Sequence, residues 1–430
     1  MLRYIIIFIS NLLAIYECGV GLLQISGLYS STHAKFILTG SFDNPGPYGG
    51  LIAILLTVLG VFVMQNKSGG KWSVKALVIL SSVSCALCII VLPATMSRAA
   101  WFALGVTALV FGLKELSLAD WIRKHKAVAT IATITMLIVM TGVFFMKKDS
   151  AIGRLHIWHM ELRAITEKPL TGHGKGSVLG VYGDTQAEYF AEKERPEIIT
   201  KVAGCPEYAF NEYLKIGIEY GIPAMVGVII VLILLIAILL KLRSSLAYGL
   251  ITFCVFAFFS YPLEAIHIKS DAENDWDSIR YLSSMELYED AVEEYAPLCD
   301  ALNGNYRFLY DYGYALYKCG RHRESIVVLK EGAAMSSDPM FYNIIGRNYE
   351  AMGLYQEAES AYLHAHYMVP QRLYPLTLLM RMHIRLGNNS EALRYGTMIL
   401  GKHINERNRT MLRLKADAKH CVDSLSLIKW

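Results

Sequence analysis

The sequence has little charge for its length. Asp, Glu, Lys and Arg make up 18% of the 430 residues, whereas soluble domains contain about 25%. Hydrophobic residues make up 54%, which excludes a disordered chain, a collagen-like chain and a small disulfide scaffold. The low charge also disfavours a wholly soluble enzyme. The net charge of +4 is too small for nucleic-acid binding by bulk attraction, so no nucleic-acid partner is expected.

The shortage of charge is concentrated in the first part of the chain. Residues 1–113 contain eight charged residues, whereas the residues after about 270 have the composition of an ordinary soluble protein. Two unlike parts are therefore present. We expect an all-α fold, with a polytopic membrane domain over residues 1–268 and a helical-repeat domain over residues 274–420.

Apolar runs define the membrane part. A helix needs about 20 apolar residues to cross the bilayer core, and seven runs reach or approach this length. The predicted spans are Tyr4–Ile25, Tyr48–Val63, Ala76–Leu92, Ala99–Leu113, Ala127–Phe145, Pro223–Leu240 and Ala247–Ala265. No small-residue cleavage site is evident in the first run, so we interpret it as a retained helix and not as a signal peptide.

Basic residues occupy alternate short loops between these spans. They are Arg3, Lys67, Lys71, Lys75, Lys114, Arg123, Lys124, Lys126, Lys241 and Arg243. Lys and Arg gather in cytoplasmic loops. The long loop 147–221 and the repeat domain are therefore expected on the outer, periplasmic side of the membrane.

The C-terminal part has a period of 33–34 residues. Small residues that each follow an acid recur at Ala291, Ser325, Ala358 and Ala392. Glycines recur with the same period at Gly320, Gly353 and Gly387. This period resembles the tetratricopeptide pattern of paired helices, in which small residues stand where two helices cross closely. Such stacks usually bind a partner and do not catalyse, so a protein partner is expected on this domain.

Two polar features stand near the first and second spans. The segment Thr39–Gly50 is rich in Gly and Pro, and Asn44 can cap the helix that follows it. A purely structural turn is favoured over a site there. Glu17 is an acid inside the first span, which makes it a functional candidate by default. It serves equally well as a buried hydrogen-bond partner, together with Gln24.

Arg98 lies at a membrane boundary in the motif Ser97-Arg98-Ala-Ala-Trp101. An arginine at such depth is costly and should face a polar cavity, and its planar donors suit phosphate oxygens. The alternative is a snorkelling arginine with Trp101 as an interface anchor. The residues alone leave both interpretations open.

The loop 147–221 contains ten basic and eleven acidic residues. It is therefore no polybasic patch, and any phosphate site must come from a few placed side chains. Its stretch Gly172–Gly176, which includes His173 and Lys175, resembles a phosphate-binding loop but lacks the G-x-x-x-x-G-K-[ST] spacing. The three histidines of the loop lack the spacing of a zinc-binding helix. Neither a metal nor a cofactor is predicted.

Together these motifs resemble the O-antigen ligase and polymerase superfamily of bacterial membrane glycosyltransferases, from about Tyr16 to Tyr261. The resemblance rests on the order of short motifs, which are Thr39-Gly-Ser-Phe-Asp-Asn-Pro, Ser97-Arg98-Ala-Ala-Trp101, Arg154 with Trp158, Pro169-Leu-Thr-Gly-His-Gly, and Asn211-Glu212-Tyr-Leu followed by Glu219-Tyr-Gly. It implies a GT-C-like helical fold in the inner membrane. It also implies a polyprenyl-diphosphate-linked glycan donor and a lipid, glycan or protein acceptor.

The family resemblance implies that two arginines near the outer face bind the diphosphate of the donor, and we assign this role to Arg98 and Arg154. Fixed guanidinium groups in a dry cleft stabilise the charge that grows on the leaving diphosphate, so a metal is not required. Residues expected in supporting roles are Glu17, Asn44, Trp158, His173, Lys175, Asn211 and Glu219.

The sequence departs from this family at two points. Ligases typically place a His just before the Asn of the last motif, where this chain has Phe210. A phenyl ring cannot take a proton, so Glu212 becomes the candidate base, with a role in starting the helix as its alternative. The family also usually carries several more spans before the position of Tyr4. These departures support a second hypothesis, a non-catalytic membrane-anchored tetratricopeptide scaffold in cell-envelope assembly. A transporter fits poorly, because no pair of broken helices repeats among the spans.

Overall fold

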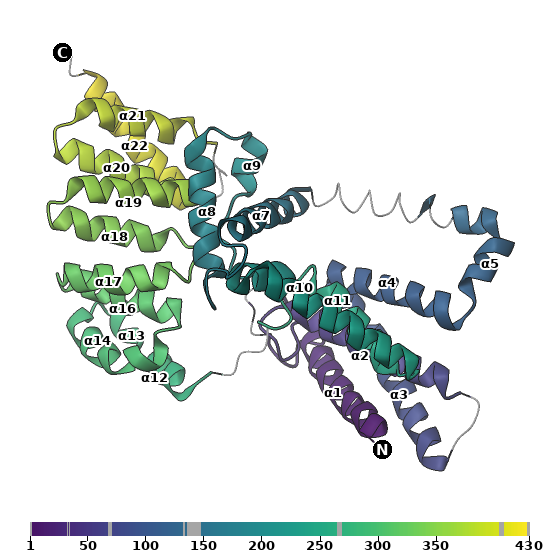
Figure 1. Cartoon of the computed structure of the whole chain (residues 1–430). Helices are drawn as coiled ribbons and strands as arrows, with labels where there is room; N and C mark the ends of the chain where they lie inside the picture. Colours follow the sequence, from purple (N-terminus) through teal and green to yellow (C-terminus); the bar gives the residue numbers. More distant parts are fainter. Residues whose placement is uncertain are drawn as a thin grey trace. The chain divides into compact units, whose positions relative to one another are not determined.

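The computed structural model describes residues 2–31, 33, 35–67, 71–131, 134–135, 148–264, 269–403 and 408–427. Within these ranges the chain forms helices and no strands, as the sequence predicts. The chain divides into two compact units (Figure 1). The first unit comprises Met1–Lys147, Tyr208–Gly217 and Ile222–His267, and the second comprises Lys148–Glu207, Ile218–Gly221 and Ile268–Trp430.

The first unit is a bundle of apolar helices. Its helices are α1 (Leu2–Ile25), α2 (Pro45–Gln65), α3 (Trp72–Val91), the short η1 (Leu92–Thr95), α4 (Arg98–Glu115), α5 (Leu118–Lys124), α10 (Glu212–Lys241) and α11 (Ser245–Ala257). Helix α2 lies at the centre and packs against α1, α3, α4 and α11. In α2, two thirds of the residues in the most apolar stretch are buried. In α10, none of the residues in the corresponding stretch is buried within the described structure.

Four helices are long and apolar enough to cross a membrane, namely α1, α2, α3 with its extension to Thr95, and α10. A fifth span results if α4 and α5, which meet at 87°, count as one. Helix α11 is shorter, with 13 residues. Most of the predicted span Ala127–Phe145 lies outside the described residues. The helices indicate a multi-pass membrane protein, and the count of seven spans remains a prediction.

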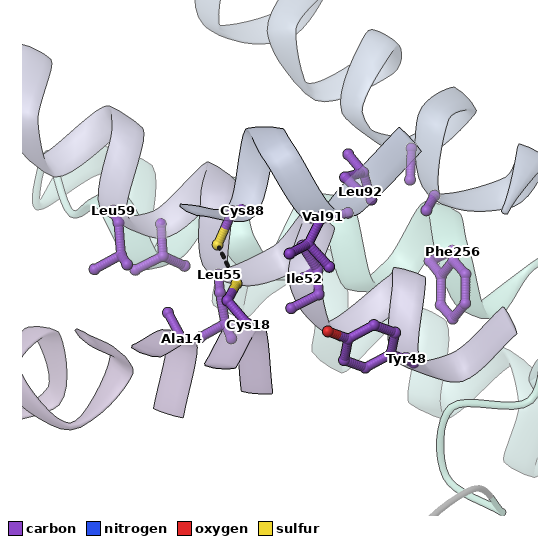
Figure 2. Close-up of a cluster of buried hydrophobic side chains, with 14 of the residues drawn as sticks. Ala14, Cys18, Tyr48, Ile52, Leu55, Leu59, Cys88, Val91, Leu92 and Phe256 are labelled. Carbon is purple, nitrogen blue, oxygen red and sulfur yellow. Dashed lines mark hydrogen bonds between the residues drawn. The ribbon is translucent and has the colours of Figure 1, made fainter. Parts of the chain in front are cut away.

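The core of the first unit lies where α1, α2 and α3 meet (Figure 2). Tyr48 and Ile52 of α2 are completely buried there. Cys18 of α1 and Cys88 of α3 are also completely buried, and their sulfur atoms lie 3.7 Å apart. The sequence Cys85-Ala-Leu-Cys88 thus contributes Cys88 to packing between two helices.

Small hydroxyl and amide side chains also connect these helices. Asn11 of α1 donates to the hydroxyl of Ser81 and accepts from that of Ser84, at 3.0 and 2.7 Å. The Thr252 hydroxyl of α11 lies 3.0 Å from that of Thr57 and 2.9 Å from that of Thr107. Since lipid offers no hydrogen-bond partners, polar side chains in spans hydrogen-bond across helices in this manner.

The second unit contains three helices from the central part of the chain and a C-terminal stack. The first three are α7 (Lys148–Glu167), α8 (Val178–Glu192) and α9 (Glu197–Val202). The stack consists of α12 (Asp271–Ile279), α13 (Tyr281–Ser284), α14 (Tyr288–Tyr295), η2 (Ala296–Leu298), α15 (Cys299–Leu302), α16 (Tyr306–Lys318), α17 (His322–Ala333), α18 (Met340–Ala351), α19 (Tyr355–Met368), α20 (Tyr374–Arg385), α21 (Asn389–Gly401) and α22 (Arg409–Leu427).

Helices of the stack pack in consecutive pairs, α16 with α17, α18 with α19, and α20 with α21 (Figure 1). The periodic small residues are completely buried, as their role at close helix crossings predicts; these are Ala291, Ser325, Ala358 and Ala392. The periodic glycines have φ values of 72–77°, which favour glycine at the end of a helix. The assignment to the tetratricopeptide class remains a prediction from this period.

Helix α8 packs against α19, in the same unit (Figure 1). The amide of Gln186, on α8, donates to the carbonyl of Met368 at the end of α19. The Asp184 carboxylate accepts hydrogen bonds from the Tyr342 hydroxyl at 3.1 Å and from His364 Nε2 at 2.9 Å. From the sequence, the loop 147–221 is expected to belong to the membrane domain. In the structure its helices α7, α8 and α9 form a compact unit with the stack.

Candidate functional site

Three helices of the first unit, α2, α4 and α10, begin at one end of the bundle. A Cβ added at Gly49 of α2 would lie 2.7 Å from the Cβ of Ser97, directly before α4. Phe102 of α4 packs edge-on against Phe259, just after α11, with ring centroids 5.3 Å apart. The Tyr213 hydroxyl of α10 donates to the Cys254 carbonyl of α11 at 3.0 Å. We call this end of the first unit the polar end.

Asparagine side chains cap two of these three helices. Asn44 accepts from the N–H of Gly46 at 2.9 Å at the start of α2, as the sequence predicts. Asn211 accepts from the N–H groups of Tyr213 and Leu214 at 3.0 and 3.1 Å at the start of α10, and its side chain is 1% exposed. Asn211 is therefore a structural cap, which fixes where the preceding and following residues lie.

The turn before α2 is held by two buried polar residues of α1. Glu17 accepts from the Ser41 hydroxyl at 2.5 Å and from the Ser41 N–H at 3.2 Å. Gln24 accepts from the N–H groups of Thr39 and Gly40 at 2.9 and 2.8 Å and donates to the Gly40 carbonyl at 2.9 Å. Tyr48 donates to the Glu17 carbonyl. Glu17 thus shapes the turn of the first motif together with Gln24.

Arg98 is the first residue of α4, follows the buried Ser97, and is half-buried. The first N–H groups of a helix lack intrahelical partners and carry partial positive charge. Arg98 therefore adds a full positive charge to a helix start at the polar end. Trp101, one turn further on, is 48% exposed.

Glu212 is the first residue of α10 and is 4% exposed. Its carboxylate accepts from the N–H of Leu263 at 2.9 Å, which ties the start of α10 to the segment after α11. Phe210 packs edge-on against Tyr261, at 5.5 Å between ring centroids, and Tyr261 stacks on Tyr208 at 4.0 Å. Phe210, at the position where the family has a His, belongs to an aromatic cluster.

An apolar groove of about 540 Å³ runs between α10 and α11 and starts at Asn211. Tyr213, Phe258 and Phe259 line the groove, together with Met225 and Ile229 further along α10. The sequence alone does not predict this groove. Its apolar residues give no signal beyond that of a membrane span, because only folding brings α10 and α11 together.

Arg154 and Trp158 lie on α7 in the second unit, one turn apart and each half-buried. Between them, His156 is 4% exposed, and its Nε2 lies 2.8 Å from the Gln186 Oε1. Burial lowers the pKa of His156, so the ring is neutral at pH 7 and packs α7 against α8. His156 is therefore structural.

Backbone N–H groups of the glycine-rich turn 172–176 donate hydrogen bonds to residues 218 and 219 of the same chain. The N–H of His173 donates to the Ile218 carbonyl at 2.7 Å, and that of Gly174 donates to the Glu219 carbonyl at 3.0 Å. The N–H of Gly176 donates to the Glu219 carboxylate at 2.8 Å. These donors are already bound, which argues against a phosphate cradle. Glu219 accordingly acts as a structural acceptor, and Lys175 is exposed.

Gly172 has a φ of 68°, and a Cβ there would lie 2.4 Å from the Glu219 carbonyl carbon. Only glycine fits this contact, which explains the glycine in the motif. His173 Nε2 lies 3.0 Å from the Ala164 carbonyl and ties the turn to α7. The turn therefore positions α7, the helix that carries Arg154.

The predicted site residues fall into two sets. The first unit contains Glu17, Asn44, Arg98, Asn211 and Glu212, and all of these lie at the polar end or support it. The second unit contains Arg154, Trp158, His173, Lys175 and Glu219. A single site that combines Arg98 with Arg154 remains a prediction. The roles of Ser41 and Tyr48 at the turn before α2 are not predictable from the sequence, because local spacing gives no signal for them.

A group of side chains in the stack has atoms close enough to share a metal ion, within 4.8 Å of one another. It consists of Glu359, His383 and Glu391. Arg394 forms an ion pair with Glu391, and the Tyr395 hydroxyl donates to Glu359 at 3.0 Å. The arginine already neutralises one acid, and its charge opposes a cation.

The apolar helices of the first unit and the polar end define a multi-pass membrane protein. Residues 83–229 match the family model described as O-Antigen ligase. This match supports the O-antigen ligase family and indicates a membrane function in glycan transfer, with lipid-linked glycan and acceptor as the substrates that the family implies. The matched range contains Arg98, Arg154, Asn211, Glu212 and Glu219. No curated protein matches the chain.

Proposed function

We propose that the protein transfers a glycan from a polyprenyl-diphosphate carrier to an acceptor hydroxyl on the periplasmic side of the bacterial inner membrane. The observation that carries this proposal is the family match over residues 83–229, because that range includes both candidate arginines and Glu212. The acceptor is a lipid, a glycan or a protein. No metal or cofactor takes part in the proposed reaction.

The polar end offers the positive charge that a diphosphate needs. Arg98 supplies a guanidinium at the start of α4, and α2 and α10 begin at the same end of the first unit. Helix starts attract anions through their partial positive charge. The donor diphosphate binds at this end, and the family resemblance assigns a second diphosphate contact to Arg154 of α7. Negative charge on the diphosphate grows as its bond to the sugar breaks, so fixed positive groups lower the barrier.

The apolar groove between α10 and α11 suits the polyprenyl chain of the donor. Its walls are almost wholly apolar, and it starts beside Asn211, one residue from Glu212. Branched hydrocarbon is stabilised by burial against such side chains. The carrier then lies along α10 with its diphosphate at the polar end.

Glu212 acts as the base in this proposal. The oxygen of the acceptor hydroxyl attacks the anomeric carbon, and the bond from that carbon to the diphosphate oxygen breaks. The bonding electron pair leaves with the diphosphate, and the hydroxyl proton passes to the Glu212 carboxylate. One carboxylate oxygen accepts from the Leu263 N–H, which orients the group for proton transfer.

The periplasmic location rests on the distribution of basic residues. Arg3, at the start of α1, donates to Gln65, at the end of α2, at 2.8 Å. This contact lies at the opposite end of α2 from the polar end. Lys71, Lys114 and Lys241 lie at the corresponding ends of α3, α4 and α10. Basic residues favour the cytoplasmic side, so the polar end faces outward.

The test is complementation of a gene deletion with arginine variants. Arg98→Ala and Arg154→Ala should each abolish glycan transfer while the protein still accumulates in the membrane. Matched controls are Lys114→Ala, at the other end of α4, and Arg163→Ala, a half-buried residue of α7 that forms an ion pair with Glu192. Both controls should retain transfer. Full transfer by Arg98→Ala or Arg154→Ala would refute the proposed diphosphate contacts.

A non-catalytic scaffold is the second candidate, and Phe210 favours it. This side chain belongs to an aromatic cluster and cannot serve as a base. In a scaffold, deletion of the gene should leave the surface glycan profile unchanged and disrupt a protein complex that the stack binds. The arginine variants should then behave like their controls. The two functions therefore differ in glycan profile as well as in the response to Arg98→Ala.

A further inference from the structure

A cavity of about 390 Å³ lies within the second unit, between the helix stack and the segment before Tyr208. Its walls come from α16, from the loops that precede α18 and α20, from Leu179 of α8 and from residues 205–207. The hydroxyl of Ser337 donates to the Pro206 carbonyl at 2.7 Å, which holds one wall against the other. This volume falls in the range of small-molecule sites.

Three arginines and three acids line the cavity, so their formal charges cancel. They form three separate pairs. Arg280 Nε lies 3.0 Å from the Asp311 carboxylate, Arg307 Nη2 lies 3.3 Å from that of Glu207, and Arg372 Nη1 lies 2.8 Å from that of Asp338. Each pair presents hydrogen-bond donors beside hydrogen-bond acceptors.

Aromatic rings complete the lining. Tyr306, Tyr310 and Phe341 face the cavity, and Tyr310 meets Phe341 edge-on at 5.2 Å between ring centroids. The Tyr310 hydroxyl makes no hydrogen bond within the described part of the chain. Burial, with smaller contributions from the charges of Asp338 and Asp311, raises the pKa of Tyr310. The hydroxyl therefore remains protonated and can donate to a ligand.

These features match a polyhydroxylated neutral ligand. A sugar hydroxyl both donates and accepts hydrogen bonds, so neighbouring hydroxyls can donate to a carboxylate and accept from its paired guanidinium. Aromatic faces carry partial negative charge and attract the C–H face of a sugar ring. An anion would need surplus positive charge, and a cation would need surplus negative charge, and the cavity offers neither. A peptide is the alternative ligand, and competition by a neutral octapeptide tests it.

We propose that this cavity binds a neutral segment of glycan through the three arginine–carboxylate pairs, the Tyr310 hydroxyl and the aromatic rings. The identity of this glycan as the one transferred rests on the proposed function. The stack and the loop helices then form a glycan-binding unit. The cavity holds a part of the glycan other than the bond that reacts.

The test measures binding of a defined probe to the full-length chain in detergent. The probe is the oligosaccharide released by mild acid from the lipid carrier of cells that lack the gene. Saturation-transfer NMR and calorimetry should detect its binding to the wild-type chain. Tyr310→Phe keeps the ring and removes the hydroxyl, so affinity should fall about tenfold, which corresponds to one hydrogen bond. Tyr314→Phe, one turn away on α16 and outside the cavity, is the matched control and should bind normally.

A second variant guards against misfolding of Tyr310→Phe. The Arg307 side chain is 58% exposed, so Arg307→Ala should fold and also weaken binding about tenfold. Failure of the wild-type chain to bind the oligosaccharide would overturn the inference. Unchanged affinity in both variants would overturn it as well, and so would displacement of the oligosaccharide by a neutral octapeptide.

The proposed function and this inference fail in different ways. Arg98→Ala should lose transfer in cells and keep full affinity for the released oligosaccharide, since Arg98 is not part of the cavity. Retained transfer by Arg98→Ala together with normal oligosaccharide binding would refute the proposed reaction alone. If the wild-type protein transfers glycan but does not bind the released oligosaccharide, only the proposed glycan-binding cavity is refuted.

Discussion

The Glu212 carboxylate accepts a hydrogen bond from the backbone N–H of Leu263 at 2.9 Å. This bond joins the first turn of α10 to the segment that follows α11. Glu212 is 4% exposed, so the same carboxylate can act as a proton acceptor or as a structural tie. The two roles require different chemistry. A base must take up a proton, whereas a structural role requires only an oxygen that accepts a hydrogen bond from an N–H.

Substitution of Glu212 by Gln separates these roles. The glutamine amide oxygen can still accept from Leu263, but it cannot take a proton at neutral pH. If Glu212 is the base, Glu212→Gln should lower the rate of glycan transfer by about 10²–10⁴-fold while the protein accumulates normally. Transfer to purified acceptor by membranes of the complemented deletion strain measures this rate.

Glu212→Ala provides the comparison. This variant loses both the base and the acceptor for the Leu263 N–H, so it should lose transfer and also accumulate less. Wild-type transfer by Glu212→Gln, together with poor accumulation of Glu212→Ala, would assign Glu212 to a structural role and leave the proposed reaction without a base.

The shape of the Arg98 side chain should matter as well as its charge. A guanidinium can bind two phosphate oxygens at once, whereas an ammonium is a single point charge. Loss of one donor to a developing charge typically lowers a rate by about 10²–10³-fold. We expect the rate of glycan transfer to fall by at least this factor in Arg98→Ala. Arg98→Lys should keep only part of the wild-type rate. Transfer assays at saturating donor compare the two variants.

The control for Arg98→Lys is Lys114→Arg at the other end of α4. This exchange should leave transfer unchanged, because the proposed diphosphate site lies at the polar end. Equal rates for Arg98→Lys and the wild type would show that a point charge suffices there, and would contradict a bidentate contact to the diphosphate.

Gln24 should contribute more to stability than its position near the end of α1 suggests. It makes three hydrogen bonds to the backbone of Thr39 and Gly40 and is 1% exposed. Gln24→Met keeps the side-chain length but leaves these buried backbone groups without partners, at a cost of about 2–3 kcal/mol. The melting temperature of the detergent-solubilised protein should fall.

Leu23→Met is the matched control for this prediction, because Leu23 is 46% exposed and makes no such contact with its side chain. Its melting temperature should stay near that of the wild type. An unchanged melting temperature for Gln24→Met would mean that the turn before α2 does not depend on α1.

Local rules account for the features that the sequence predicted well. An N-cap needs only an oxygen two or three residues before the N–H groups that it accepts, and Asn44 obeys this rule. The 33–34-residue period placed small residues at close helix crossings, and Ala291, Ser325, Ala358 and Ala392 are completely buried. In both cases the partners lie close in sequence or recur with a fixed period.

Contacts between distant segments account for what the sequence could not predict. The Gly172–Gly176 turn resembled a phosphate-binding loop, but its N–H groups bind residues 218 and 219, more than forty positions further along the chain. The Ser41 contact with Glu17 likewise depends on how the turn before α2 folds back onto α1. No local pattern distinguishes a free N–H from one that is occupied by a distant carbonyl.

His366 should make the stability of the second unit depend on pH. Its side chain is 4% exposed, and its Nδ1 has no hydrogen-bond partner within the described residues. Burial, with a smaller contribution from Lys402, lowers the pKa of His366 to about 3. An unfolded histidine has a pKa of about 6.5. Below that value the unfolded chain binds a proton that the folded chain excludes, so the stabilisation is complete above about pH 6.5 and is lost as the pH falls.

Between about pH 7.5 and about pH 5, this difference should lower the free energy of unfolding by about 2 kcal/mol. His366→Leu removes the titrating group, so its melting temperature should fall less than that of the wild type over the same pH interval. His420→Leu changes an exposed histidine of α22 and should keep the wild-type dependence. If His366→Leu and His420→Leu lost stability equally on acidification, the ring of His366 would have to be accessible to protons in the folded protein.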